Sequence, residues 1–418
     1  MLTSKLLSNS ARGRAPIPAR RSLCHKTYLK PKANNYHWPY ERRSYGLLNF
    51  WMDPFTKSKF DENSLLIQVE GNVSAGKQDF AKTLAEELGM AYFPQPDLDS
   101  YYINDHGYDY RALNPILPER LRICDWEMFH ENPSRHSVIH MQYYLYKLRL
   151  FQHYKALRHI FNTGQGVVMT RTAFTERAIV EAMHNVGWLP KGHLREDGAR
   201  FYDWKHRHTF LRNMTLSIIH QPHLCIYLDT PVDVCLERVR NDPDPMIANS
   251  KVHTREFLEE IETAFKEIVL PKAEHNMHLI AVDNTKPKTR EEVCDIIDDL
   301  SHLSFKYDPH DTRFETWDTK NRRFWYLDAR RRLTTRNATV EINQKLSAEW
   351  YDVAGLGDSI TQADLRLRQS LFESHVGQFG FNQEYDTDPK VHGIFRRLFG
   401  TYKNFGERVN KDLRADFV

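Results

Sequence analysis

Apolar and polar positions alternate in a regular order through the middle of this chain. Five short apolar runs, rich in β-branched and aromatic residues, have the length of buried strands, and amphipathic stretches with helical spacing follow most of them. The predicted strands are residues 65–71, 91–93, 166–170, 223–229 and 279–282. The predicted helices are residues 77–88, 137–161, 231–240 and 290–303. Strands that alternate with helices in this way predict an α/β fold in which helices flank a parallel sheet.

The first predicted strand runs directly into a glycine-rich segment, Gly-Asn-Val-Ser-Ala-Gly-Lys at 71–77. A strand, a loop of this spacing and a helix are together typical of a phosphate-binding loop. Its glycines let successive backbone N–H groups face a polyphosphate, and its lysine reaches the outer phosphates. The alternative is a glycine turn beside a solvated lysine. The residues expected to bind a nucleotide are Gly71, Asn72, Ser74, Ala75, Gly76 and Lys77.

The position after the loop lysine departs from the pattern of an active loop. An active loop carries Ser or Thr there, and the hydroxyl group holds Mg²⁺. This chain has Gln78 instead. A carboxamide is longer and cannot sit where a hydroxyl one carbon from the helix backbone would sit. The sequence therefore predicts a loop without its usual metal ligand.

The composition narrows the class of protein further. An apolar content of 41% in 418 residues supports a large packed core. No apolar run approaches the ~18 residues that a membrane span needs, so we expect a soluble or peripheral protein. The five cysteines form no Cys-x-x-Cys pair, and the histidines lack metal-ligand spacing. We therefore expect a reducing compartment and no metal site.

The first forty residues carry eight Lys or Arg and no acidic residue. Such a leader is typical of a mitochondrial presequence, and the apolar core of a secretory signal is missing. A basic arm that binds RNA is the alternative. Without these forty residues the chain has 50 basic and 55 acidic side chains, a net charge of −5. The overall charge of +3 is therefore no argument for nucleic-acid binding, and we expect no nucleic-acid partner.

These patterns divide the chain into four regions. We assign residues 1–35 to the presequence, 36–60 to an aromatic and basic N-terminal extension, 61–305 to the α/β domain and 306–418 to a C-terminal extension. Both extensions interleave aromatic with basic residues, as in Arg-Arg-Phe-Trp-Tyr at 322–326. The N-terminal extension has two possible packing partners, its own domain or else a partner protein or bilayer surface, and the sequence does not decide between them. For the C-terminal extension we expect docking on acidic neighbours or lipid headgroups, with RNA binding as the alternative.

Four segments resemble deoxynucleoside kinases in order and spacing. They are the loop at 71–77, Asn-Pro-x5-Ile-x-Met-Gln at 132–142, Gly-Gln-Gly-Val-Val-Met-Thr-Arg-Thr at 164–172 and Tyr-Leu-Asp-Thr-Pro-x-x-Val-Cys-Leu-Glu-Arg at 227–238. The resemblance implies a P-loop nucleoside-kinase fold for residues 61–305. It also implies that Gln142 and Arg171 bind a nucleoside, and retention for structural reasons is the alternative for both residues.

The same resemblance implies that the catalytic groups are lost. Phosphoryl transfer needs groups that position the acceptor hydroxyl, the metal and compensating charge. The kinases carry a glutamate base where this chain has Gln95, and an acid that helps to organise Mg²⁺ where it has Thr170. A neutral amide is no general base, and a hydroxyl does not replace that acid. With Gln78, these degenerate positions predict a protein with no catalytic residue and no kinase activity.

The flanking segments extend the resemblance. Ser-Tyr-Gly-Leu-Leu-Asn-Phe at 44–50, Asp-Glu-Asn-Ser at 61–64 and Phe-Lys-Tyr-Asp at 305–308 are similar to segments of the kinase-like accessory subunits of mitochondrial complex I, the alpha-subcomplex subunit ten family. This resemblance implies a non-catalytic subunit that supports the assembly or stability of a complex passing electrons from NADH to ubiquinone. An active mitochondrial deoxynucleoside kinase is the alternative.

The resemblance to these subunits also implies partners, place and cofactors. We expect the chain to contact other complex I subunits and to lie peripherally on the matrix side of the inner membrane. No cofactor is expected to be required, and FAD, FMN and iron–sulfur clusters are not expected. Binding of a nucleotide at the loop stays open, because backbone N–H groups and Lys77 do not depend on the lost carboxylates.

Overall fold

The sheet predicted from the apolar runs is present, and its five strands are parallel. The computed structural model describes residues 40, 60, 63–103, 109–119, 122–135, 137–189, 220–305, 308, 312–317, 330, 331, 333 and 334. The strands are β1 (Leu66–Gly71), β2 (Ala91–Phe93), β3 (Val167–Thr170), β4 (Leu224–Asp229) and β5 (His278–Asp283). Their order is β2-β3-β1-β4-β5. The predicted fold class is therefore confirmed, and each predicted strand differs at its ends by one residue at most.

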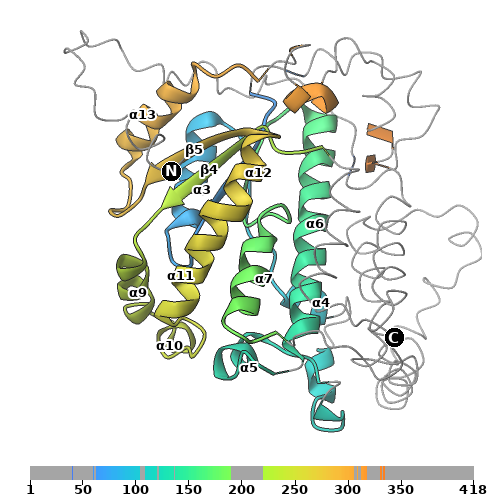
Figure 1. Ribbon diagram of the computed structural model, residues 1–418. Coiled ribbons are helices and arrows are strands. Elements are labelled where there is room, and N and C mark those ends of the chain that lie inside the picture. The colour runs from blue at the N-terminus through green and yellow to red at the C-terminus, as the bar shows by residue number, and fades with distance from the viewer. Residues whose placement is uncertain are drawn as a thin grey trace, which may run out of the picture.

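Different helices cover the two faces of the sheet, because alternate strand residues point to opposite sides. Ile67 and Val69 of β1 share one core with residues of α3 (Lys77–Leu88) and α13 (Arg290–Leu300). Leu66 shares the opposite core with α6 (Val138–Thr163). The same layer contains α7 (Glu176–Asn185), α11 (Arg255–Ala264) and α12 (Leu270–Glu274), and α6, α7 and α11 run side by side (Figure 1).

The helix after the loop has the bounds that the sequence predicted. It begins after Gly76 and ends before Gly89, and both glycines have positive φ angles, 78° and 62°. Such angles are open to glycine at no steric cost, and the second one terminates the helix. Phe80, Ala81 and Leu84 are buried on its inner face. The spacing of the apolar residues and the two glycines therefore determine this helix locally.

Other helices follow the prediction less closely. The predicted helices 137–161 and 231–240 correspond to α6 and α9 (Val232–Arg240), and the last one ends at Leu300, three residues before its predicted end. The structure adds helices that we did not predict. Within the α/β domain these are α4 (Asp99–Tyr102), η3 (Tyr110–Leu113), α5 (Trp126–Glu131), α7, α10 (Pro245–Ala248), α11, η5 (Phe265–Val269) and α12.

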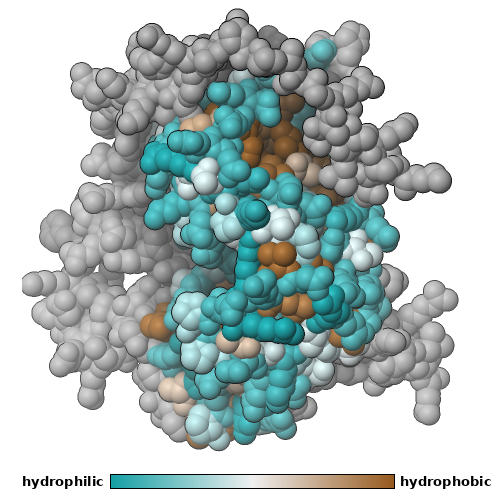
Figure 2. All heavy atoms as spheres, turned by 90° about the vertical axis from the view of Figure 1, so that its left-hand side faces the viewer, coloured by the Kyte–Doolittle hydropathy of each residue, from teal (hydrophilic) through white to brown (hydrophobic). Residues whose placement is uncertain are grey.

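The outer surface near α9 and α13 is largely hydrophilic (Figure 2). On α13, Val293 and Leu300 are buried, whereas Glu291, Glu292 and Asp295 are exposed. This amphipathic distribution fits a helix that covers a sheet on one side and meets solvent on the other. Within the described residues, no helix has the length and the apolar character that crossing a membrane requires.

Part of the predicted N-terminal extension contacts the α/β domain. The hydroxyl group of Tyr40 lies 2.6 Å from Nδ1 of His159 on α6, and the guanidinium carbon of Arg158 lies 5.6 Å from the centre of the Tyr40 ring. The ring of Phe60 packs edge to face on Phe161, also on α6. For these residues the chain's own domain is the packing partner. The presequence at 1–35 lies outside the described residues.

Residues assigned to the C-terminal extension also pack on the domain. In η6 (Thr312–Trp317), Phe314 is buried, and Nε1 of Trp317 donates to the carbonyl of Gln221 at 2.8 Å. Arg330 is fully buried, and its Nε donates to Oδ1 of Asn162 at 3.0 Å. These side chains are therefore not free to dock on a partner, although the basic and aromatic run at 322–326 lies outside the described residues.

Candidate functional site

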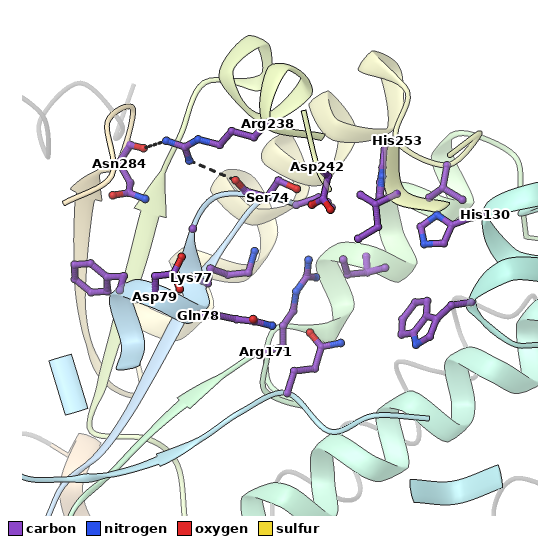
Figure 3. Close-up of a pocket in the computed structure, with 18 of the residues that line it drawn as sticks. Ser74, Lys77, Gln78, Asp79, His130, Arg171, Arg238, Asp242, His253 and Asn284 are labelled. Atoms are coloured by element: carbon purple, nitrogen blue, oxygen red, sulfur yellow. Dashed lines mark hydrogen bonds between the residues drawn. The ribbon is translucent and has the colours of Figure 1, made fainter. Parts of the chain in front are cut away.

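A cavity of about 830 Å³ opens at the carboxyl ends of the strands, where ligands commonly bind in parallel sheets. Its volume lies in the range of small-molecule sites. The loop forms one wall, and α6 and the segment between α9 and α11 contribute others (Figure 3). The predicted site residues that line it are Ser74, Gly76, Lys77, Gln78, Gln95, Gln142 and Arg171. Those outside its lining are Gly71, Asn72, Ala75 and Thr170.

The loop adopts the tight backbone turn that its glycines predict. Gly71 has a φ angle of 156°, and a Cβ atom there would lie 2.8 Å from the carbonyl oxygen of Leu228. Gly76 has a φ angle of 78°. Ser74 and Arg171 are the non-glycine residues with positive φ angles in the described part of the chain. Because such angles are unfavourable for L-residues, the backbone is strained at Ser74 and Arg171, and both residues line the cavity.

Side chains from α9 and the end of β5 hold the carbonyl groups of the loop. Arg238 donates to the carbonyl of Ser74 at 3.3 Å and to the carbonyls of Asn284 and Thr285 at 3.0 Å each. Nδ2 of Asn284 donates to the carbonyl of Ala75 at 2.7 Å. Figure 3 shows the Arg238 guanidinium between the loop and Asn284. The protein itself therefore supplies contacts that keep the loop in shape.

Lys77 and Asn72 interact with the loop and its surroundings. The ammonium group of Lys77 donates to the carbonyl of Asn72, and burial lowers the pKa of Lys77 well below its ordinary value, with Arg171 acting in the same direction. Nδ2 of Asn72 donates to the carbonyl of Leu258 on α11 at 2.9 Å. Oδ1 of Asn72 accepts from the amide of Val73 at 2.8 Å. Asn72 thus ties the loop to α11.

Basic side chains outnumber acidic ones in the lining of the cavity. Arg149 on α6 pairs with Glu176 on α7, and burial, followed by the nearby Arg171, lowers the pKa of Arg149 to about 9. Oε1 of Glu70 accepts from the amide of Thr172 at 2.8 Å. The basic lining residues are Lys77, Arg149, Arg171, Arg238 and Lys288, and the acidic ones are Asp79 and Asp242. This excess of positive charge suits an anionic ligand.

The three degenerate positions lie near the loop, but only two of them line the cavity. Gln78 and Gln95 are among its lining residues. Thr170 is 2% exposed at the end of β3, and its hydroxyl has no hydrogen-bond partner among the residues that the structure describes. In that same part of the chain, no group of three or more His, Cys, Asp or Glu side chains is arranged to hold a metal ion.

The side of the cavity away from the loop is apolar and aromatic. It is lined by Leu145 and Gln142 of α6, and by Trp126, Phe129, His130, Ile179, Val252, His253 and Phe257. A flat apolar wall with a few polar groups can hold a ring system such as a nucleobase. Of these residues, the sequence predicted Gln142 alone as part of the site. The spacing of residues 142, 145 and 149 could have indicated one lining face of α6, since i, i+3 and i+7 share a helical face.

Comparisons with known proteins identify the family of this chain. The family model for deoxynucleoside kinase matches residues 67–302. NADH dehydrogenase (ubiquinone) 1 alpha subcomplex subunit 10 of Mus musculus is 30% identical over 267 residues, which is 63% of this chain and 69% of the relative. The same subunit of Bos taurus is 26% identical over 284 residues, 67% of this chain and 76% of the relative.

Among solved structures, the deoxyadenosine kinase of M. mycoides with bound dATP is 16% identical, with a TM-score of 0.40 over 57% of this chain and 99% of that chain. The family model covers more than half of the 418 residues, and the mouse relative is matched over two-thirds of its length. The chain therefore belongs to the deoxynucleoside kinase family and, within it, to the group of the alpha subcomplex subunit 10 proteins.

Proposed function

We propose that this chain is a non-catalytic accessory subunit of mitochondrial complex I. The observation that carries the proposal is the side-chain chemistry at three positions: the amides of Gln78 and Gln95 line the cavity, and the hydroxyl of Thr170 is buried outside its lining. Phosphoryl transfer would need a hydroxyl, a base and an acid at those places. The similarity to subunit 10 proteins of complex I supports the same reading.

The expected loss of catalytic rate is too large for a working kinase. Removal of a general base alone typically lowers a rate by a factor of ~10² to 10⁴. Loss of two groups that organise the metal lowers it further, although such losses are not additive. We expect no measurable phosphoryl transfer.

The cavity retains what is needed to bind a nucleotide without turnover. The loop keeps its turn, the lining carries excess positive charge, and the far wall is aromatic. We infer that a nucleotide occupies the cavity as a structural ligand, which stabilises the folded state by mass action. No other cofactor is proposed. The residues proposed to touch it are Ser74, Gly76, Lys77, Gln142 and Arg171.

In this proposal the chain lies on the matrix side of the inner membrane and is held there by contacts with other complex I subunits. The acid-free leader and the names of the relatives support a mitochondrial site. The absence of a membrane-spanning helix from the described residues is compatible with peripheral attachment.

Native electrophoresis of mitochondria, probed for this chain, tests the proposal. We expect migration with complex I and loss of complex I when the chain is depleted. Migration as a free protein, with complex I unaffected by depletion, would overturn it. Purified chain should transfer no phosphate from ATP to deoxynucleosides. A turnover that is abolished by Lys77→Ala would favour the alternative, an active deoxynucleoside kinase.

A further inference from the structure

A segment between α9 and α11, residues 241–254, crosses one side of the cavity, and we call it the strap. Its lining residues are Asp242, Met246, Ile247, Val252 and His253. Figure 3 shows Asp242 and His253 on the side of the cavity that faces the loop and Arg171. On this side of the cavity, the strap lies between a bound ligand and solvent.

At its far end the strap contacts His130 of α5. Nδ1 of His130 lies 2.5 Å from Oγ of Ser250, and the amide of Lys251 donates to the carbonyl of His130 at 3.0 Å. The rings of His130 and His253 meet edge to face, with centroids 5.1 Å apart. Three successive contacts between 250 and 253 therefore converge on a single side chain and its backbone.

The hydrogen-bond pattern assigns a direction to the contact with Ser250. The hydroxyl oxygen of Ser250 accepts from the amide of Val252 at 3.1 Å. The hydroxyl hydrogen is then free to point to Nδ1 of His130. Burial lowers the pKa of His130, which favours the neutral ring and an unprotonated Nδ1. The contact is therefore a serine hydroxyl that donates to an imidazole.

The strap buries little apolar surface of its own. Val252 is its one buried side chain, and α10 within it has no buried residue. A segment with so little apolar burial opens at a small free energy, so a few hydrogen bonds account for a large part of its closure. At the near end, Arg238 at the last turn of α9 is fixed to the loop and to the end of β5. The strap is thus anchored at one end and latched at the other.

We propose that His130 is the latch that holds the strap closed over the cavity, and that opening of this latch controls how fast a ligand enters and leaves. As regulation of the nucleotide site, this inference rests on the proposed function. The closure itself is a property of the protein without ligand, because every contact that forms it lies within the chain.

Hydrogen–deuterium exchange on the purified full chain without nucleotide tests the latch. We expect Ser250→Ala, which loses the hydrogen bond to His130 and the one accepted from the amide of Val252, to accelerate exchange of the other strap amides by at least about fivefold, the effect of one net hydrogen bond. His130→Ala should accelerate it further. His130→Asn, whose side chain places a polar atom near the position of Nδ1, should restore slow exchange. Lys251→Ala is the matched control, since its side chain is exposed and its amide still donates to His130.

Faster exchange confined to the strap would support the latch. Equal strap exchange in wild type, Ser250→Ala and His130→Ala would overturn it. If His130→Ala also accelerates exchange in β1 and β4, the fold has loosened. Ser250→Ala then decides, because it removes a half-buried hydroxyl and leaves the aromatic packing of His130 intact.

A second measurement uses ATP that carries a fluorescent methylanthraniloyl group on its ribose. In Ser250→Ala, whose changed residue does not line the cavity, opening of the latch should raise the association and dissociation rates of this nucleotide by similar factors and leave the dissociation constant nearly unchanged. A change in affinity with unaltered rates of entry would contradict the latch. If wild type binds no such nucleotide, the nucleotide proposal fails, while the exchange experiment still decides the latch.

Discussion

The guanidinium group of Arg238 donates a hydrogen bond to the carbonyl oxygen of Ser74, 164 positions earlier in the chain, at 3.3 Å. Two further bonds from the same group reach the carbonyls that follow β5. An arginine at the end of α9 therefore stabilises the loop with protein contacts, in a position where it also lines the cavity. It connects three elements that meet only in the folded state.

We expect Arg238→Ala to loosen the loop. Hydrogen bonds from a charged donor contribute about 1.5–3 kcal/mol each, and some of the lost bonds are replaced by water, so a total loss of about 2–3 kcal/mol is expected. Urea unfolding measures it. Arg240→Ala is the control, because Arg240 is exposed on the same helix. Equal stabilities of the two variants would mean that Arg238 does not hold the loop.

Nucleotide binding should be independent of Mg²⁺ in wild type and become dependent on it in Gln78→Ser. The serine hydroxyl restores the ligand that active loops use, whereas Gln78 does not occupy that place. Calorimetric titration of ATP with Mg²⁺ and with a chelator compares the two proteins, and Gln78→Ala serves as the control. Tighter binding of wild type in the presence of Mg²⁺ would show that another group takes over the metal.

The C-terminal extension should contribute to folding as well as to docking. Trp317 stacks on Phe161, with ring centroids 5.8 Å apart, and donates to the carbonyl of Gln221. Trp317→Ala should destabilise the chain by about 3 kcal/mol, as large-to-small changes in packed sites do. Trp317→Phe, which keeps the stacking and loses the hydrogen bond, should cost about 1 kcal/mol. Thermal unfolding of wild type and the two variants measures both losses of stability.

A truncation after residue 311 should for the same reason unfold the domain at lower temperature, since it removes Phe314, Trp317 and Arg330. Failure of such a chain to join complex I would then report instability and not a lost docking surface. Unchanged thermal unfolding of the truncated chain would contradict this expectation.

Acid should destabilise the fold through His223. This residue is buried, and Nδ1 accepts from the amide of Leu66 at 3.0 Å. Burial, followed by His220 and His278, lowers its pKa from 6.5 to about 3. The unfolded chain therefore binds a proton that the folded chain rejects between these values. Stability from this group is complete above pH 6.5 and falls as the pH drops toward 3, by about 2 kcal/mol at pH 5.

His223→Asn should remove this pH dependence, because asparagine keeps an acceptor for the Leu66 amide and does not titrate. Unfolding free energies at pH 7 and pH 5 measure the effect, with His302→Asn, at an exposed position, as the control. The unfolding free energy could instead fall by the same amount between pH 7 and pH 5 in His223→Asn and in wild type. Other groups would then cause the acid sensitivity.

The sequence by itself determined the strands, the loop and the helix that follows. These features depend on neighbours in the chain: strand patterns on alternate residues, the turn on Gly71 and Gly76, and the helix end on Gly89. The departures at Gln78 and Gln95 were equally visible, since they are properties of single positions within a motif. The part of the site that the sequence predicted is therefore the part encoded locally.

Only the tertiary structure decided which other groups share the cavity. The contact between Arg238 and Ser74 and the contact between His130 and Ser250 each join residues more than 100 positions apart. Likewise, Arg330 reads as a basic surface residue in sequence but is buried against α6. Such pairings depend on how helices pack on the sheet, and packing is determined by the whole core at once, so no local pattern encodes them.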